Sequence, residues 1–123
     1  MTVLASLFPI NAQKVAIIGS RDYADLDRVR AFVETLPSNT IVISGGARGV
    51  DRAAAEAARK RKLQVIEHLP DWDRYGRFMA PKVRNQQIAD DAEVAVTFWD
   101  GHSPGTRDAI ERFEALGKTV IQL

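Results

Sequence analysis

The fold is decided by the stretch Ile41-Val42-Ile43-Ser44-Gly45-Gly46-Ala47-Arg48-Gly49-Val50-Asp51. A short apolar run leads into a glycine-rich turn, and the alanine-rich segment 53–58 follows, an order typical of a buried strand, a turn and a helix. Glycine lets a backbone approach a ligand closely, and a helix start directs N–H groups and a positive dipole end at the same point. Arg48 adds a forked cationic donor. The stretch predicts a phosphate site; the alternative is a tight turn with nothing bound.

The same alternation of strand and helix runs through the rest of the chain. Apolar runs predict strands at residues 14–18, 41–44, 63–68, 93–98 and 119–123. Apolar residues at helical spacing predict helices at 26–36, 50–62, 83–90 and 109–116, with Asp22 as the N-cap of the first and Gly117 closing the last. Residues 70–81, which hold two prolines, are expected to form a loop. This order predicts an α/β fold, a doubly wound, mostly parallel five-stranded sheet with helices on both faces.

Length and composition limit the class of protein. The 123 residues suffice for one core, so we expect an N-terminal extension at residues 1–13 and a single domain at residues 14–123. The absence of cysteine excludes disulfides and thiolate metal sites and fits a cytoplasmic protein. Two histidines without ligand spacing predict no metal. A net charge of +1 and the lack of a long apolar run predict no membrane partner and argue against nucleic acid.

Polar residues follow four of the predicted strands at the point where each strand ends. The carboxyl ends of parallel strands share one edge of a sheet, and open α/β sheets bind ligands at that edge. We therefore expect one ligand site there, which holds no metal and no cofactor. The candidate ligand-binding residues are Gly19, Ser20, Arg21, Ser44, Gly45, Gly46, Arg48, Gly49, Asp51, Trp72, Arg84, Asn85, Asp100, Gly101, Ser103, Gly105 and Thr106.

Three of these candidates are arginines, whose planar fork suits phosphate or carboxylate: Arg21, Arg48 and Arg84. The alternative for each is an internal ion pair with a nearby aspartate, namely Asp22, Asp51 or Asp100.

The other candidates also have two interpretations each. Small hydroxyl-bearing residues at 103–106 suit a second anion or a ribose, and ordinary helix capping by Ser103 is the alternative. Asp51 can accept a ribose hydroxyl or orient Arg48, although interaction with the helix dipole suffices to explain it. Trp72, in the predicted loop, can cover a base.

These motifs in their order resemble the SLOG superfamily, and within it the small YspA/YpsA-related branch. The resemblance covers roughly residues 14–123 and rests on Gly19-Ser20-Arg21, the stretch from Ser44 to Asp51, Pro70-Asp71-Trp72, Arg84-Asn85, and Phe98 to Thr106. It implies a Rossmann-like fold that binds nucleotides or nucleotide-derived ligands, often as a sensor. It also implies a homodimer or a higher homo-oligomer.

Two relatives imply sharper alternatives. The LOG phosphoribohydrolases cut the N-glycosidic bond of a nucleoside monophosphate, and Ser103-Pro104-Gly105-Thr106 resembles a shortened form of their Pro-Gly-Gly-x-Gly-Thr motif. The paired glutamates of that motif are missing, so the implied catalytic residues are Arg84 with Asp108 or Glu111. The DNA-processing protein A family shares the Gly-Ser-Arg, Ala-Arg-Gly-Val-Asp and Arg-Asn elements and binds single-stranded DNA.

Together these patterns predict a cytoplasmic, single-domain protein that binds a phosphorylated nucleotide or nucleotide-derived small molecule. A binding protein or sensor is favoured over an enzyme, because the expected carboxylates are absent from their place in the motif. The alternatives are an N-glycosidic hydrolase and a single-stranded DNA binder.

Overall fold

Five parallel strands form one sheet in the computed structural model, which describes residues 12–123, in the order β3-β2-β1-β4-β5. The strands are β1 (Lys14–Gly19), β2 (Ile41–Ser44), β3 (Gln64–Glu67), β4 (Val94–Phe98) and β5 (Thr119–Gln122). The chain runs outward from β1 to β3, then crosses back to β4 and β5, so the strand order reverses direction beside β1. The α/β, doubly wound prediction is confirmed. Most of the expected N-terminal extension, residues 1–11, lies outside the described residues.

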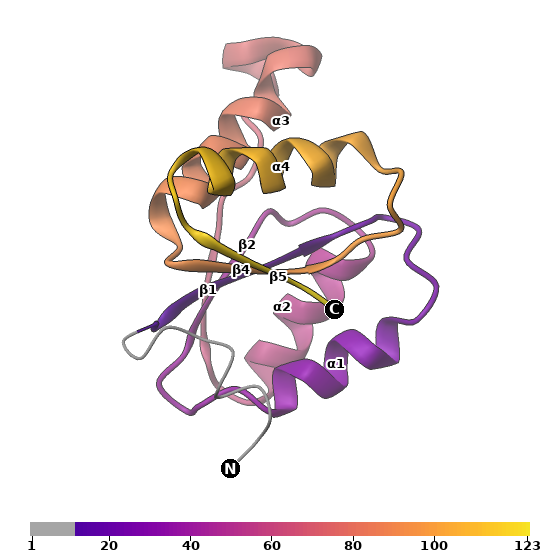
Figure 1. Cartoon of the computed structure of the whole chain (residues 1–123), viewed down its shortest axis with the longest axis vertical. Helices are drawn as coiled ribbons and strands as arrows, with labels where there is room; N and C mark the ends of the chain where they lie inside the picture. The colour runs from indigo at the N-terminus through magenta and orange to yellow at the C-terminus, as the bar shows by residue number, and fades with distance from the viewer. Residues whose placement is uncertain (1–11) are drawn as a thin grey trace.

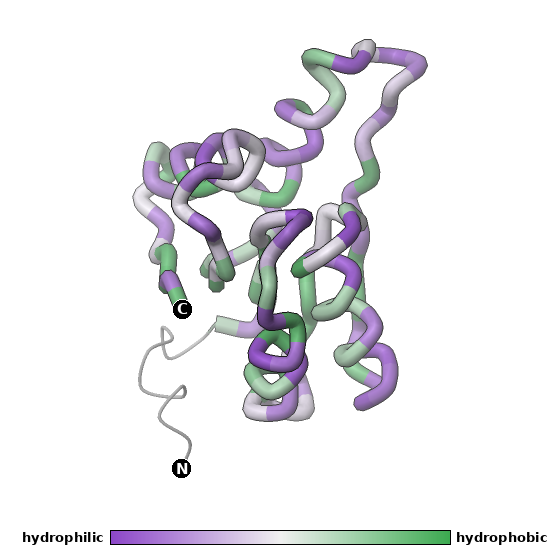
Figure 2. The backbone as a smooth tube through the Cα atoms, turned by 90° about the vertical axis from the view of Figure 1, so that its right-hand side faces the viewer, coloured by the Kyte–Doolittle hydropathy of each residue, from purple (hydrophilic) through white to green (hydrophobic). Residues whose placement is uncertain are grey.

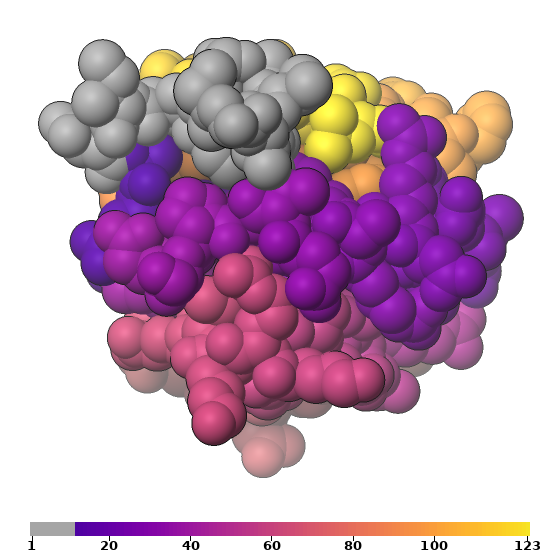
Figure 3. Space-filling view, turned by 90° about the horizontal axis from the view of Figure 1, so that it is seen from below, coloured from indigo at the N-terminus to yellow at the C-terminus, as the bar shows by residue number. Residues whose placement is uncertain are grey.

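Two helices cover each face of the sheet (Figure 1). They are α1 (Leu26–Glu34) and α2 (Val50–Lys60) on one face, and α3 (Trp72–Asp91) and α4 (Pro104–Ala115) on the other. Figure 3 shows the molecule from the side of α1 and α2, whose surfaces lie side by side. Within residues 12–123, no helix has both the length and the apolar character needed to cross a bilayer.

The core lies on both faces of the central strands, where hydrophobic residues are concentrated (Figure 2). Alternate residues of β1 and β4 point to opposite faces. One set packs under α1 and α2, and it includes Phe98, whose ring meets those of Tyr23 and Phe32 edge-on at 5.8 and 5.7 Å. The other set, under α3 and α4, is built from smaller residues such as Ala16 and Ala95.

The prediction of a loop at residues 70–81 is wrong, because α3 already begins at Trp72. Asp71 caps the helix by accepting a hydrogen bond from the backbone N–H of Arg74 at 3.1 Å. Gly76 then leaves helical geometry, with φ of +75°, and the helix continues through Pro81 in a new direction. Glycine and proline therefore mark a kink inside a helix here.

The N-cap predicted for α1 is also wrong. Asp25 takes that position, and its side chain accepts a hydrogen bond from the N–H of Arg28 at 3.2 Å. Asp22 is exposed in the preceding turn and lies 3.5 Å from Arg48 in an ion pair.

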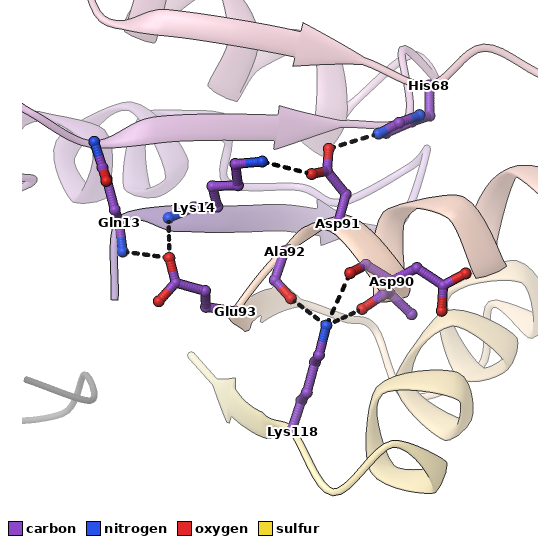
Figure 4. A network of polar contacts seen from close by, with 9 residues as sticks. Gln13, Lys14, His68, Asp90, Asp91, Ala92, Glu93 and Lys118 are labelled. Carbon is purple, nitrogen blue, oxygen red and sulfur yellow. Dashed lines mark hydrogen bonds and ion pairs between the residues drawn. The ribbon is translucent and has the colours of Figure 1, made fainter. Parts of the chain in front are cut away.

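Polar contacts fix the C-terminal end of α3 against the sheet (Figure 4). Lys118 donates to the carbonyl oxygens of Ala89, Asp90 and Ala92 at 2.6, 3.1 and 2.7 Å. The carboxylate of Asp91 contacts Lys14 and His68 at 2.9 Å each, and hydrogen bonds from His68 and Lys14 hold the pKa of Asp91 below its ordinary value. These contacts anchor the C-terminal end of α3 to β1 and to the segments that follow β3 and α4.

Candidate functional site

A cleft of about 330 Å³ lies at the carboxyl edge of the sheet, beside the end of β1 and between α3 and α4. Its volume is at the lower end of the range for small-molecule sites. It occupies the place where the strand order reverses, at which open α/β sheets bind ligands. Its lining residues are Ile18, Gly19, Arg21, Asp22, Ala47, Asp51, Pro81, Arg84, Asn85, Ile88, Ser103, Pro104, Gly105, Thr106 and Ala109.

Arg84 and Asn85 of α3 connect the two sides of the cleft. The guanidinium of Arg84 donates to the carbonyl oxygen of Gly45, and its Nε donates to Oδ1 of Asn85 at 3.0 Å. The Asn85 amide nitrogen donates to the carbonyl oxygen of Gly105 at 3.3 Å and to Asp108 at 2.9 Å. The glycine turn, α3 and the start of α4 are therefore held in fixed relation.

The N-terminal end of α4 forms one wall of the cleft. Asp100 arranges the chain before it, because its carboxylate accepts hydrogen bonds from the backbone N–H groups of Ser103 and His102 at 2.8 Å each and from the Ser103 hydroxyl at 2.9 Å. These bonds lower the pKa of Asp100 to about 2. The Ser103 hydroxyl is thus engaged with Asp100, and Gly105 and Thr106 bring the first turn of α4 to the cleft.

The glycine turn leaves room for two side chains of the chain itself, the Asp51 carboxylate and the Arg84 guanidinium. Gly45 lies between Asp51 and Arg84, and a Cβ there would sit 2.8 Å from Oδ2 of Asp51 and 3.0 Å from a guanidinium nitrogen of Arg84. Asp51 is buried, and burial raises its pKa to about 6, against the opposing effect of Arg84 and of backbone hydrogen bonds at Ala47, Gly19 and Gly45. Burial also lowers the pKa of Arg84. The wall of the cleft therefore carries a carboxyl group whose pKa lies well above its ordinary value.

The structure brings about half of the predicted ligand-binding residues together. The predicted residues that line the cleft are Gly19, Arg21, Asp51, Arg84, Asn85, Ser103, Gly105 and Thr106. Others shape the adjoining turns without lining it: Ser20, Ser44, Gly45, Gly46, Gly49, Asp100 and Gly101. Arg48 pairs with Asp22 on the surface, as its alternative interpretation foresaw. Trp72 lies half-exposed on the projecting start of α3, away from the cleft lining.

The acidic candidates for catalysis lie beside or away from the cleft. Burial tends to raise the pKa of Asp108, but hydrogen bonds from Arg112 and Asn85 outweigh it, so the pKa ends below its ordinary value. Asp108 also forms an ion pair with Arg112 at 2.9 Å. Glu111 is exposed one turn further along α4 and does not line the cleft. The catalytic assignment to Arg84, Asp108 and Glu111 therefore stays a prediction.

Several cleft residues were missed by the sequence analysis. They are Ile18, Asp22, Ala47, Pro81, Ile88, Pro104 and Ala109. Pro81 and Ile88 stand at helical spacing with Arg84 and Asn85, so a helix extended back through the proline would have placed all four on one face. The part of the chain that the structure describes holds no group of three His, Cys, Asp or Glu residues able to bind a metal ion.

The fold and cleft together define a Rossmann-like domain with a small polar site at its carboxyl edge. The chain belongs to the YspA, cpYpsA-related SLOG family, whose model matches residues 13–75. It is 33% identical over 119 residues to the Gene 61 protein of Mycobacterium phage D29, covering 89% of this chain and 94% of that protein.

Two solved structures share the fold. DNA processing protein A from Streptococcus pneumoniae has a TM-score of 0.79 at 20% identity, over 92% of this chain and 50% of that chain. DNA processing protein A from Helicobacter pylori, whose structure concerns its single-stranded DNA binding mode, has a TM-score of 0.65 at 18% identity, over 92% and 66%. The chain thus spans half to two thirds of these proteins.

This similarity corrects one expectation. The near-neutral charge predicts that nucleic acid is not a partner, and that expectation is wrong, since proteins of this fold include DNA processing protein A. A net charge of +1 over the whole chain does not report how cations are placed on its surface.

Proposed function

We propose that the cleft binds a phosphorylated nucleotide or nucleotide-derived small molecule, and that the protein acts as a binding protein or sensor. One observation carries the proposal: Arg21, Arg84 and the N-terminal turn of α4 converge on a single cleft at the carboxyl edge of the sheet. Guanidinium groups and helix N-termini are the two features that most favour a phosphate.

The charges around Arg84 support an anionic ligand. Across residues 12–123, no carboxylate comes within ion-pair distance of Arg84 or Arg21. Arg84 has one hydrogen bond to Gly45 and one to Asn85, which leaves donors of its fork for a ligand. Asp51 on the same wall offers an acceptor for a ribose hydroxyl.

Binding is favoured over N-glycosidic cleavage by the state of the two acids that the motif implies for catalysis, Asp108 and Glu111. Asp108 is held by Arg112 and Asn85, and its lowered pKa keeps it ionised, which suits it poorly to protonate a departing base. Glu111 lies on the exposed side of α4.

Thermal unfolding with AMP, ADP-ribose and NAD tests the proposal. A ligand at 100 times its Kd adds about 2.7 kcal/mol, so we expect the Tm of the wild type to rise by several degrees. Arg84→Ala should weaken binding roughly 10-fold to 100-fold, because a charged hydrogen bond is worth about 1.5–3 kcal/mol. Arg28→Ala removes an exposed arginine of α1, outside the cleft, and is the matched control. This variant should show the same ligand-induced rise in Tm as the wild type.

Two results would contradict the proposal. If Arg84→Ala showed the same ligand-induced rise in Tm as the wild type, the nucleotide would bind somewhere other than this cleft. Free base released by the wild type, detected by chromatography and lost in Asp108→Ala or Glu111→Ala, would establish the hydrolase instead.

Single-stranded nucleic acid is a second candidate ligand, on a different surface. The start of α3 projects from the body of the molecule (Figure 1). In this segment, residues 72–78, Trp72, Tyr75 and Phe78 are exposed by 49%, 36% and 77%. Arg74 lies over the Tyr75 ring at 5.3 Å and Arg77 over the Phe78 ring at 5.4 Å. Exposed rings interleaved with guanidinium groups suit stacked bases and their phosphates, and the similarity to DNA processing protein A favours such a ligand.

Fluorescence polarisation with a labelled oligothymidylate tests this candidate. Removing two rings in Trp72→Ala/Phe78→Ala should weaken binding at least about tenfold, since each stacked base is worth about 1–3 kcal/mol. Arg84→Ala, in the cleft, should bind the oligonucleotide as the wild type does. Equal binding by the double variant and the wild type would exclude the projecting segment as the nucleic-acid surface.

A further inference from the structure

Asp51 is a buried acid in the wall of the cleft. None of the ion pairs among residues 12–123 includes its carboxylate. Backbone hydrogen bonds at Ala47, Gly19 and Gly45 stabilise the ionised form, and the guanidinium of Arg84 lies on the other side of Gly45. The negative charge of Asp51 is therefore offset by backbone groups and by one nearby cation, without a direct ion pair.

An anionic ligand in this cleft would lie close to that carboxylate. Asp51, Arg84 and Arg21 all line the same space of about 330 Å³. A space of this volume is roughly 9 Å across, so an anion bound by the two guanidinium groups comes within that distance of Asp51. Ile18 and Ile88 form part of the lining, so water screens the two negative charges less than it does at an open surface. Ligand and carboxylate therefore repel each other while Asp51 is ionised.

The cations that face Asp51 are those that the ligand would use. Arg84 comes from α3 and Arg21 from the turn after β1, and their charges also act on each other, since Arg21 lowers the pKa of Arg84. On α2 itself, the neighbouring Arg52 is exposed. Once a phosphate occupies Arg84 and Arg21, these guanidinium groups are shared between two anions.

Three other acids lie around the cleft in different environments. Asp22 is exposed and pairs with Arg48 at 3.5 Å. Hydrogen bonds lower the pKa of Asp100 to about 2, and the pKa of Asp108 also lies below its ordinary value. Burial instead raises the pKa of Asp51. Asp51 is therefore the acid of the cleft wall that takes up a proton most readily when a second negative charge approaches.

We propose that the cleft binds its anionic ligand together with one proton from solvent, which Asp51 takes up and donates as a hydrogen bond to a ligand oxygen; this rests on the proposed nucleotide-binding function. Protonation removes the repulsion and turns one carboxylate oxygen into a donor, while the other oxygen still accepts from a ribose hydroxyl. Affinity is then highest at low pH and falls as the pH rises through the range in which Asp51 of the free protein ionises. A sensor of this kind responds to pH as well as to its nucleotide.

Titration calorimetry of the full chain with ADP-ribose tests the proposal. The diphosphate of ADP-ribose keeps its charge between pH 5 and pH 8, whereas a phosphate monoester such as AMP has a second pKa of about 6 and would confuse the result. The Kd of the wild type should rise at least about tenfold from pH 5 to pH 8, because each pH unit above the pKa of the free carboxyl weakens binding by up to about tenfold. At pH 7, two buffers of different ionisation enthalpy should report an uptake of at least about half a proton per ligand.

Asp51→Asn separates the effect of Asp51 from that of every other titrating group. An amide stays neutral and keeps its N–H donors at all pH values. The Kd of this variant should change less than about threefold over the same range, without proton uptake. Asp27→Asn removes an exposed acid of α1 that pairs with Arg30, and this matched control should keep the pH dependence of the wild type. Circular dichroism checks that each variant is folded.

The outcomes distinguish this inference from the proposed function. A wild-type Kd that stays constant with pH, binding without proton uptake, or the full pH dependence in Asp51→Asn would each overturn proton-coupled binding and leave nucleotide binding intact. If neither ADP-ribose nor NAD bound the wild type at any pH, nucleotide binding would fail and this inference with it. The proton count uses the wild type alone, so it decides the question even if Asp51→Asn does not fold.

Discussion

Asp51 is the residue whose chemistry most distinguishes this cleft. A buried carboxylate next to a glycine turn is held there by backbone hydrogen bonds and by the field of Arg84. Gly45 is required between them, because any side chain at that position would meet both groups. The glycine that seemed from the sequence to admit a phosphate instead admits Asp51 and Arg84.

Asp51 should make stability depend on pH. Its folded-state pKa, about 6, exceeds the ordinary 3.8, so the folded chain holds this proton more tightly than the unfolded chain does. Its contribution is therefore complete below pH 4 and is lost as pH rises through 6, on the order of 3 kcal/mol for a shift of about two units. Asp51→Asn should gain stability relative to the wild type by that amount between pH 4 and pH 7.

Urea unfolding at intervals across this range measures the difference. Subtracting the wild type from the variant removes the other titrating groups, whose lowered pKa values act in the opposite direction. Asp27→Asn removes an exposed acid in the first turn of α1 and is the matched control. A pH-dependent difference for Asp51→Asn no larger than that of this control would show that the Asp51 carboxylate is not desolvated.

Among the elements, α3 is held at its C-terminal end by a lysine from another part of the chain, Lys118. Lys118 donates hydrogen bonds to three carbonyl oxygens at the C-terminal end of α3. Its positive charge also interacts favourably with the negative end of the helix dipole. Lys118→Met keeps most of the side-chain volume and should lower the free energy of unfolding by about 2 kcal/mol.

Chemical denaturation gives that value directly. Lys60→Met, at the end of α2, removes a lysine from an exposed helix end and should cost less than about 0.5 kcal/mol. If both variants lost the same amount, the contacts of Lys118 would add nothing beyond a surface charge.

The same helix shows where sequence patterns fail. Val83 to Asp90 was predictable as a helix from its spacing, but the start at Trp72 was not. Pro70, Gly76 and Pro81 each signal a break, and only the three-dimensional path shows that one precedes the helix and the others lie within it. Because the direction of α3 changes at Gly76, the sequence could not indicate that Trp72 lies away from the cleft.

At the scale of the whole molecule, the predicted α/β fold is confirmed, and the reason lies in the order of its strands and helices. Strands alternating with helices have few right-handed arrangements, and in each of them the loops after Gly19, Ser44 and Phe98 meet at one edge. That rule brought Arg21 and Ser103 together correctly, whereas Arg84 reaches the cleft from the middle of α3. The rule does not choose among side-chain partners. Asp22 was one of three aspartates offered to the arginines, and the Asn85–Asp108 contact was not predicted, because both contacts depend on side-chain directions within loops and helices.

The strand order also has a consequence for the time course of folding. β1 is the central strand, and it pairs with β4 on one side. Because β4 comes late in the sequence, it is synthesised only after most of the chain. The hydrogen bonds from Gln13 to Glu93 and from Asp100 to Ser20 each join residues 80 positions apart. A chain emerging from a ribosome therefore carries its central strand with one edge unpaired until β4 appears. Closing so long a loop slows folding, and in that interval the exposed edge is open to pairing with other chains.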